Sequence, residues 1–297
     1  MDNKEKNLFH TVSIIGIGLI GSSIARGIKK HNIANKVVGY AKTLKTREKA
    51  MDLGYMDQVF DSANDAIKDA DLVILCVPVG ANRDIMVEIS DNLSEGTILT
   101  DVGSVKAEVI KQLKDIIPDK VSFIPAHPIA GTEFSGPESG FAELFDHKWC
   151  VLTPYEKSKK QDIKKVKNFW ERLGMNVDEM SPEYHDLVLA ITSHIPHLIA
   201  YNIVGTATNL AEITRKEVTK YAAGGFRDFT RIASSDPIMW RDIFLNNQEA
   251  VLEMLDKFSD DLSSLREAIK KKDGKELQKY FTKTRDIRKK ILQQEGK

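Results

Sequence analysis

The 297-residue sequence has few of the features that mark secreted, membrane or nucleic-acid-binding proteins. Its two cysteines are too few for a disulfide framework. The 43 basic and 43 acidic residues cancel, so the charge balance does not indicate nucleic acid or an anionic membrane as a partner. The N-terminus lacks the apolar core of a signal peptide, and no run approaches the ~20 apolar residues needed to span a bilayer. These absences predict a cytoplasmic protein whose partner is a small molecule.

A glycine-rich turn near the N-terminus is the first distinctive feature that is present. Residues 11–15 (TVSII) form a β-branched apolar run suited to a buried parallel strand, and GIGLIG follows directly and opens an amphipathic helix. In a dinucleotide-binding turn, Gly16 allows the sharp bend, Gly18 lets a pyrophosphate approach the backbone, and Gly21 lets helix and strand pack closely. Strand, turn and helix in this order predict a bound dinucleotide. The expected cofactor-binding residues are Gly16, Gly18, Leu19, Ile20, Gly21, Tyr40, Val77, Pro78 and Gly103.

The second expected strand, residues 36–40 (KVVGY), ends where the adenosine ribose of the dinucleotide would lie. An NAD-type site places an acidic residue there to bind the ribose 2′-hydroxyl, but this chain has Ala41 followed by Lys42. A 2′-phosphate would find a counter-charge in Lys42 or Arg47, whereas the alternative interpretation is a solvated helix start with ordinary surface lysines. These residues leave NAD versus NADP open; we name NAD as the cofactor, with NADP possible.

Strands and helices alternate along the first 180 residues. The apolar run 72–77 (LVILCV) and the run 97–104 (TILTDVGS) are further expected strands. This βαβ order predicts an α/β fold with a doubly wound, Rossmann-type parallel sheet that binds ligands at the carboxyl ends of its strands. Ser181 and Pro182 are a typical start of a helix, and nearly all of the chain beyond them is expected to be helical. The sequence thus predicts a dinucleotide-binding domain over 1–180 and an all-helical domain over 181–297.

A histidine stands close to one of these strand ends, in the segment HPIAGTE at 127–133. We expect this segment to form a tight loop shaped by its proline and glycine. The unperturbed pKa of histidine lies near neutrality, so His127 suits the role of a proton acceptor whose reaction rate rises with pH through neutrality. A proton acceptor close to a dinucleotide predicts hydride transfer.

Two clusters in the helical half complete the candidate site. In SHIPH at 193–197, Pro196 interrupts the regular helix, so that a histidine side chain can project into a cavity. His194 and His197 lack a third ligand at a recognisable spacing, so no metal site is expected. The segment 224–237 (GGFRDFTRIASSDP) combines two glycines with arginines, and the planar guanidinium group suits a carboxylate. This second cluster predicts an anion-binding site.

Taken together, these motifs resemble the prephenate dehydrogenase family, in the wider group of prephenate, arogenate and cyclohexadienyl dehydrogenases. The resemblance covers about residues 11–244, and its blocks are GIGLIG, DVGSVK (101–106), HPIAGTE, MSPEYHD (180–186), SHIPH and GGFRDFTRIASSDPIMWRDIF (224–244). It implies oxidative decarboxylation of prephenate to 4-hydroxyphenylpyruvate in tyrosine biosynthesis. It also implies a homodimer joined through the helical domain. Arogenate is the alternative substrate.

The resemblance also implies roles for the matched residues. His127 would take the proton of the substrate's ring hydroxyl, and Ser104 would orient His127 and contact the nicotinamide side. Arg231 would hold a substrate carboxylate, and His197 would face the pyruvyl side chain. The expected site therefore consists of catalytic His127, Ser104 and His197, with substrate-binding Arg231, Glu133, Gly224, Gly225 and Trp240.

Simpler interpretations apply to some of these residues. A tryptophan on a helix, such as Trp240, is more often part of a core, and His194 suits a stabiliser of the helix break better than a substrate contact. Two rival functions are also open. A β-hydroxyacid dehydrogenase or a pyrroline carboxylate reductase would rely on a lysine or on other polar residues in the helical half, so His127 and Arg231 argue against it. The other rival is a catalytically silent dinucleotide sensor, which has no need of a base and an anion-binding arginine.

Overall fold

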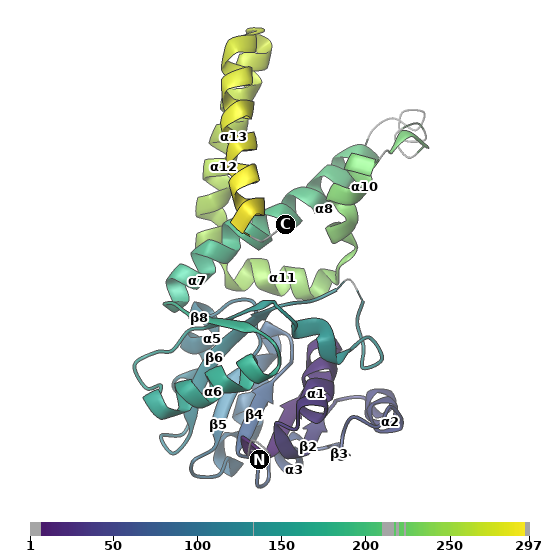
Figure 1. Cartoon of the computed structure of the whole chain (residues 1–297), viewed down its shortest axis with the longest axis vertical. Coiled ribbons are helices and arrows are strands. Elements are labelled where there is room, and N and C mark those ends of the chain that lie inside the picture. The colour runs from purple at the N-terminus through teal and green to yellow at the C-terminus, as the bar shows by residue number, and fades with distance from the viewer. Residues whose placement is uncertain (1–6, 133, 210–216, 218–219, 223, 295–297) are drawn as a thin grey trace, which may run out of the picture. The chain divides into compact units, whose positions relative to one another are not determined.

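The computed structural model describes residues 7–132, 134–209, 217, 220–222 and 224–294. By its internal contacts the chain divides into two compact units, Met1–Gln248 and Glu249–Lys297, and each is described by itself. The first unit contains an eight-stranded sheet with the strand order β3-β2-β1-β4-β5-β6-β7-β8 (Figure 1). Its strands are β1 (Phe9–Ile15), β2 (Ala34–Tyr40), β3 (Gln58–Phe60), β4 (Leu72–Leu75), β5 (Ile98–Asp101), β6 (Ser122–Ile129), β7 (Trp149–Leu152) and β8 (Asn176–Glu179).

The sheet is doubly wound, as the sequence predicts. Strands β1 to β6 pair in parallel, whereas β7 is antiparallel to β6 and β8 is parallel to β7. Successive residues of a strand face opposite sides of a sheet, and accordingly Ile14 and Ile15 are buried in two different hydrophobic cores. The helices that cover the two faces are α1 (Leu19–His31), α2 (Leu44–Asp52), α3 (Ala63–Ala66), α4 (Asn82–Ile89), α5 (Ala107–Leu113) and α6 (Lys160–Arg172), with the 3-10 turns η1 (Val79–Ala81), η2 (Ser90–Asn92) and η3 (Ala142–Phe145).

After β8 the rest of the first unit is helical. The Ser181 hydroxyl accepts a hydrogen bond from the Tyr184 N–H at 3.2 Å, and Pro182 lies in the first turn, so this helix begins as the sequence predicts. A π-helical segment ends at His194, two residues before Pro196, whose missing N–H breaks the regular hydrogen-bond ladder. The elements here are α7 (Pro182–Leu189), the π segment η4 (Ala190–His194), α8 (Ile195–Thr208), α10 (Gly224–Thr230), the 3-10 turn η5 (Arg231–Ser234) and α11 (Pro237–Asn246).

One stretch within the described residues, Pro182–Thr208, is long and apolar enough to cross a membrane by length and composition alone. It has 27 residues, and its most apolar 18-residue window has a mean hydropathy of 1.5. From the sequence we expect no run of the length that spans a bilayer, whereas this stretch reaches that length although it contains interspersed polar residues. Asp186 within it accepts hydrogen bonds from the backbone N–H groups of Lys106 and Ala107, so its first helix is tied to the part of the unit that contains the sheet.

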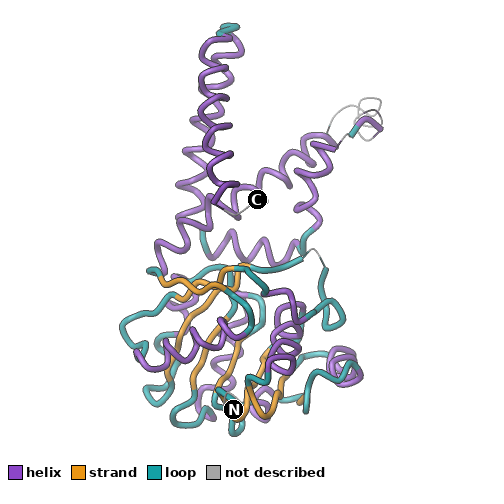
Figure 2. The backbone as a smooth tube through the Cα atoms, in the orientation of Figure 1, coloured by secondary structure: helices purple, strands orange, loops and turns teal. Residues whose placement is uncertain are grey.

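Helix α11 also packs against the part of the unit that contains the sheet. A Cβ atom at Gly80 would lie 3.1 Å from Oδ2 of Asp242, and Gln112 donates a hydrogen bond to Asn246 at 3.1 Å. Because of this packing, the division into compact units falls after α11 rather than after β8. The second unit consists mainly of α12 (Gln248–Lys270) and α13 (Gly274–Gln294), which run as a helical hairpin (Figure 2).

Candidate active site

The three glycines of the N-terminal turn have the environments that a dinucleotide requires. Gly16 has a φ of +102°, and a Cβ atom there would lie 2.6 Å from the carbonyl oxygen of Cys76. A Cβ atom at Gly21 would collide with the carbonyl oxygen of Gly16, so helix α1 can approach β1 only with glycine there. Among the described residues, no atom lies within 4 Å of the Cβ position of Gly18, and Gly18 itself, the N-cap of α1, supplies no side-chain cap. The turn therefore offers open space and free N–H groups to a pyrophosphate.

The other expected cofactor residues surround this turn. The Gly16 N–H donates to the carbonyl oxygen of Tyr40 at 2.9 Å, which joins the ends of β1 and β2. Val77 and Pro78 follow β4, and Gly103 is buried directly after β5, where a Cβ atom would lie 2.9 Å from Asp101 Oδ2. The nine predicted positions thus lie at or just beyond the carboxyl ends of β1, β2, β4 and β5, including the partly buried Leu19 and Ile20 at the start of α1. This edge of a doubly wound sheet is where ligands bind.

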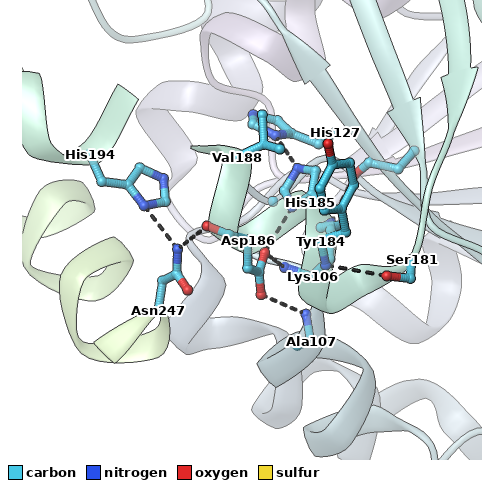
Figure 3. A network of polar contacts seen from close by, with 12 residues as sticks. Lys106, Ala107, His127, Ser181, Tyr184, His185, Asp186, Val188, His194 and Asn247 are labelled. Carbon is cyan, nitrogen blue, oxygen red and sulfur yellow. Dashed lines mark hydrogen bonds and ion pairs between the residues drawn. The ribbon is translucent and has the colours of Figure 1, made fainter. Parts of the chain in front are cut away.

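His127 lies on the adjacent strand. It belongs to β6 itself and pairs with Val151 of β7, so the expected loop begins only at Ala130. Its side chain is 6% exposed. The Nδ1 atom of His127 lies 2.8 Å from Nε2 of His185, and Nδ1 of His185 lies 2.8 Å from Oδ1 of Asp186 (Figure 3). A carboxylate and two imidazoles therefore form a continuous buried chain.

The hydrogen-bond partners determine which ring nitrogens carry protons. The ionised Asp186 carboxylate can only accept, so Nδ1 of His185 carries its proton. In the neutral ring, Nε2 of His185 is then an acceptor, and Nδ1 of His127 must be the donor. The remaining nitrogen of His127, Nε2, keeps its lone pair. This arrangement leaves His127 ready to accept a proton from a substrate hydroxyl.

The surroundings of His127 keep its ring neutral. Burial lowers the pKa of His127 well below its usual range, and charges on His185, Lys106 and His194 act in the same direction. Burial also lowers the pKa of His185, although the carboxylate of Asp186 opposes that effect. At neutral pH both rings are therefore uncharged, which is the protonation state that a general base needs.

A buried ion pair fixes the strand ends beside His127. The ammonium group of Lys106 donates to Asp101 and, at 2.8 Å, to the carbonyl oxygen of Ala126, the residue before His127. Both charged side chains are fully buried. The carboxylate of Asp186 in turn accepts the N–H groups of Lys106 at 2.8 Å and Ala107 at 2.9 Å. The same carboxylate therefore orients His185 and caps the start of α5.

His194 extends this network without reaching His127. Asn247 donates to the backbone carbonyl of Asp186 at 2.9 Å and lies 3.1 Å from Nδ1 of His194. Burial lowers the pKa of His194 to about 4. Among the described residues, its Nε2 atom has no hydrogen-bond partner. His194 therefore has the structural position that the simpler interpretation expects, next to the helix break.

His197 and Trp240 stack on one another, with ring centroids 3.7 Å apart and an interplanar angle of 24°. The Nδ1 atom of His197 lies 2.8 Å from the carbonyl oxygen of Ser193, so Nδ1 carries the proton and Nε2 is available. Trp240 is 5% exposed and forms a small core with Val105 and Ile243. Its evident function is to support the imidazole of His197.

The expected anion-binding residues lie on the elements that follow. Arg231 is exposed at the start of η5, and its charge lowers the pKa of His197, although burial is the larger cause. The two side chains are therefore near enough to interact electrostatically. Gly224 and Gly225 are exposed at the start of α10, and none of the hydrogen bonds among the described residues connects them to His127.

Two expectations need correction or fall outside the structure. Within the part of the chain that the structure describes, the half-buried Ser104 makes no hydrogen bond to His127, because His185 occupies the Nδ1 side of that ring. Glu133 lies outside the described residues.

The residues that sequence reasoning missed are His185, Asp186, Lys106, Asp101 and Asn247. A signal was present, since four of these five fall within the quoted blocks DVGSVK and MSPEYHD.

The segment that follows His127 folds back onto α1. The Tyr55 hydroxyl donates to the carbonyl oxygen of Pro137 at 3.2 Å, and the Phe141 N–H donates to the Ser23 hydroxyl at 3.1 Å. Between these contacts, a Cβ atom at Gly140 would collide with the Ser22 hydroxyl. The loop beyond His127 is thus seated on the helix that begins at the glycine turn.

Comparison with known proteins identifies the family. Residues 24–179 match the family model for the prephenate dehydrogenase nucleotide-binding domain, and residues 181–283 match that for the prephenate dehydrogenase dimerization domain. A cyclohexadienyl dehydrogenase of Zymomonas mobilis is 43% identical over 281 residues, which are 95% of this chain and 96% of the relative. A prephenate dehydrogenase of Bacillus subtilis is 35% identical over 279 residues, which are 94% of this chain and 75% of the relative.

A solved structure gives the same result. The crystal structure of prephenate dehydrogenase from A. aeolicus in complex with hydroxyphenyl propionate and NAD+ superposes with a TM-score of 0.89 at 39% identity, covering 95% of this chain and 98% of that one. The two family models together span most of the sequence, which sets aside the β-hydroxyacid dehydrogenases and pyrroline carboxylate reductases. The chain therefore belongs to the prephenate dehydrogenase family of NAD(P)-dependent oxidoreductases.

Proposed function

We propose that this chain converts prephenate to 4-hydroxyphenylpyruvate by oxidative decarboxylation, with His127 as the general base. The observation that carries the proposal is the hydrogen-bonded chain from Asp186 through His185 to His127, which leaves Nε2 of His127 unprotonated at the carboxyl edge of the sheet. Arogenate is the second candidate substrate, and the cyclohexadienyl dehydrogenase relative supports it. Prephenate and arogenate differ only in a keto group versus an amino group on the side chain.

The glycine turn and the edge residues Tyr40, Val77, Pro78 and Gly103 would hold the dinucleotide. The NAD+ bound to the A. aeolicus enzyme supports NAD as a cofactor of this chain. When bound, the nicotinamide supplies the acceptor for the hydride. The free N–H groups at the start of α1 would meet the pyrophosphate, and Gly18 leaves space for it.

His127 would hold the reaction's proton at each stage. Its Nε2 atom accepts the proton of the hydroxyl at C4 of the ring, and the electron pair of the C4–H bond leaves as hydride, so that C4 becomes a carbonyl carbon. The bond between C1 and its carboxylate then breaks, carbon dioxide leaves, and the electron pair makes the ring an aromatic phenolate. The phenolate takes the proton back from His127. While His127 is protonated, Asp186 stabilises its charge through His185.

Arg231 and His197 would bind the two substrate carboxylates. Arg231 would hold the ring carboxylate by charge-assisted hydrogen bonds, while His197 would face the pyruvyl side chain. The influence of Arg231 on the pKa of His197 supports placing both at one anion-binding site. The exposed Gly224 and Gly225 would let the backbone approach the substrate, and Ser104 would contact the nicotinamide side.

The helical region would also join two copies of the chain. We propose that 1–180 form the dinucleotide-binding domain and 181–297 a helical domain for substrate binding and dimerisation, which the positions of the two matched family models support. Large apolar side chains are exposed on the helical part of the first unit, among them Ile191, Ile203, Tyr221 and Phe229. Burial of such surface is a usual reason for a stable homodimer. Light scattering should give twice the chain mass, and a monomer at micromolar concentration would contradict the proposal.

An assay that crosses prephenate and arogenate with NAD+ and NADP+ tests the proposed function directly. Absorbance of the reduced nicotinamide should increase with prephenate, and carbon dioxide should appear in equal amount. Turnover only with arogenate would show that arogenate, and not prephenate, is the substrate of this chain. The absence of turnover in all four combinations would contradict the enzyme function.

A further inference from the structure

The residues that follow β2 form a positively charged group beside the nucleotide turn. The carbonyl oxygen of Tyr40 accepts the Gly16 N–H at 2.9 Å, so the chain beyond Tyr40 starts directly at the turn. Residues 41–47 (AKTLKTR) contain three cationic side chains and no acidic one. Ala41 is buried and offers no acceptor to a ribose hydroxyl. The carboxylate that characterises NAD-type sites is therefore missing from this edge.

Arg47 is positioned by the backbone of this same segment. Its Nη1 atom donates to the carbonyl oxygens of Ala41 at 2.9 Å and Lys42 at 3.1 Å. These two bonds hold the guanidinium group against the residues that follow β2. Among the described residues, the hydrogen bonds of Arg47 use only Nη1, so the other edge of the guanidinium group remains for a ligand.

Two hydroxyls and a lysine complete the group. The Thr43 hydroxyl accepts the Thr46 N–H at 3.2 Å and lies 2.8 Å from the Thr46 hydroxyl, which fixes the start of α2. Lys42 and Thr43 are exposed. A guanidinium group, an ammonium group and hydroxyls are the usual donors to the oxygens of a phosphate monoester.

We infer that Lys42, Thr43 and Arg47 form a binding site for a phosphate on the ribose 2′-oxygen, so that this chain binds NADP+ more tightly than NAD+. The inference rests on the proposed function only in taking the glycine turn as the dinucleotide site. Two effects favour NADP+. The cations attract the 2′-phosphate, and the absence of a carboxylate at position 41 removes both the partner of the 2′-hydroxyl and the charge that would repel a phosphate.

Calorimetric titration of the full chain tests this inference without any turnover. NADP+ should bind at least about tenfold more tightly than NAD+, because charge-assisted hydrogen bonds to the phosphate form only with NADP+. Adenosine 2′,5′-bisphosphate and adenosine 5′-monophosphate should show the same ratio, since both lack the nicotinamide end. The ratio should fall as salt is added. Equal or tighter binding of NAD+ would overturn the inference, whether or not the chain oxidises prephenate.

Three variants locate the effect. Lys42→Ala should weaken NADP+ binding about tenfold and leave NAD+ within about twofold. Ala41→Asp should reverse the preference, because it supplies the missing carboxylate. Lys49→Ala, an exposed lysine further along α2, is the matched control and should change neither constant. If Lys42→Ala and Ala41→Asp both leave the ratio unchanged, these residues do not form the phosphate site.

Discussion

The Nδ1 atom of His127 and the Nε2 atom of His185 lie 2.8 Å apart, although 58 residues separate them in the chain. His127 comes from strand β6 and His185 from helix α7, so the contact joins the sheet to the helical region. Beyond it, Asp186 accepts from the other nitrogen of His185. This carboxylate–imidazole–imidazole chain sets the direction in which His127 can take up a proton, and the first predictions depend on it.

Replacing His127 by Asn removes the proton acceptor but keeps a side chain that can form hydrogen bonds. Turnover should fall about 100- to 10,000-fold, which is the usual contribution of a general base. The Michaelis constant for prephenate should change by no more than a few fold. His147→Asn, at an exposed histidine remote from the network, is the control. Near-normal turnover of the His127 variant in steady-state assays would remove His127 from the mechanism.

His185 should act as a positioning residue. His185→Leu leaves the Nδ1 proton of His127 without an acceptor, and turnover should drop about 10- to 100-fold, as when the partner that orients a functional imidazole is lost. His185→Gln supplies an acceptor oxygen and should recover part of the loss, while the Michaelis constant stays nearly constant in both variants. Equal rates for the Gln and Leu variants would show that the hydrogen bond does not matter.

The pH dependence should differ from the one expected for an unperturbed histidine. Burial lowers the pKa of His127, so the ring is already neutral at pH 7. Because the unprotonated form is active, the rate should rise with pH on the acid side of the ordinary histidine pKa of about 6.5 and be level through neutrality. A rate profile between pH 4 and 8 checks this. A rise centred above pH 7 would mean that another group titrates.

Arg231 and Arg227 lie four residues apart and form a matched pair for testing the anion site. Arg231→Ala should raise the Michaelis constant about 10- to 100-fold, since a hydrogen bond to a charged group contributes about 1.5–3 kcal/mol. Arg227→Ala removes the same charge from the exposed face of α10 and should leave the constant nearly unchanged. Equal effects of the two substitutions on the Michaelis constant would show that Arg231 does not bind a substrate carboxylate.

The buried histidines should make the fold sensitive to acid. Burial lowers the pKa of His194 to about 4 in the folded chain, whereas the unfolded chain titrates near 6.5. The contribution of neutral His194 to the free energy of unfolding is complete above pH 6.5. It is lost as the pH falls from there toward 4, by about 2 kcal/mol between pH 6.5 and 5. His194→Phe retains a ring beside Trp240 and should show a weaker pH dependence of the free energy of unfolding in urea titrations. Identical slopes for the two proteins would exclude His194 as the cause.

The nucleotide-binding features were predictable from the sequence because they are local. The turn from Gly16 to Gly21 combines a strand run, a glycine spacing and a helix start, all within about fifteen residues. The helix start at Ser181 and the interruption at Pro196 are local in the same sense, and the structure confirms both. Each depends on backbone geometry that a few neighbouring residues dictate.

The polar network was not predictable in the same way. The hydrophobic periodicity of the helix did not predict a buried or functional His185, because a histidine in the first turn of a helix is usually exposed. Only the packing of α7 against α5 and β6 buries it against His127. The family resemblance implied that Ser104 orients His127, whereas in the structure His185 contacts Nδ1 of that ring. The antiparallel direction of β7 was equally unpredictable, since an apolar run gives no information on the direction in which the strand will pair.

Gly140 lies where the loop that follows β6 meets helix α1. Its missing side chain lets the loop that leaves the catalytic strand rest on Ser22, within the helix that begins at the glycine turn. A larger side chain at position 140 would push helix α1 and the loop that follows β6 apart. We therefore expect a substitution at Gly140 to disturb both proposed ligand sites.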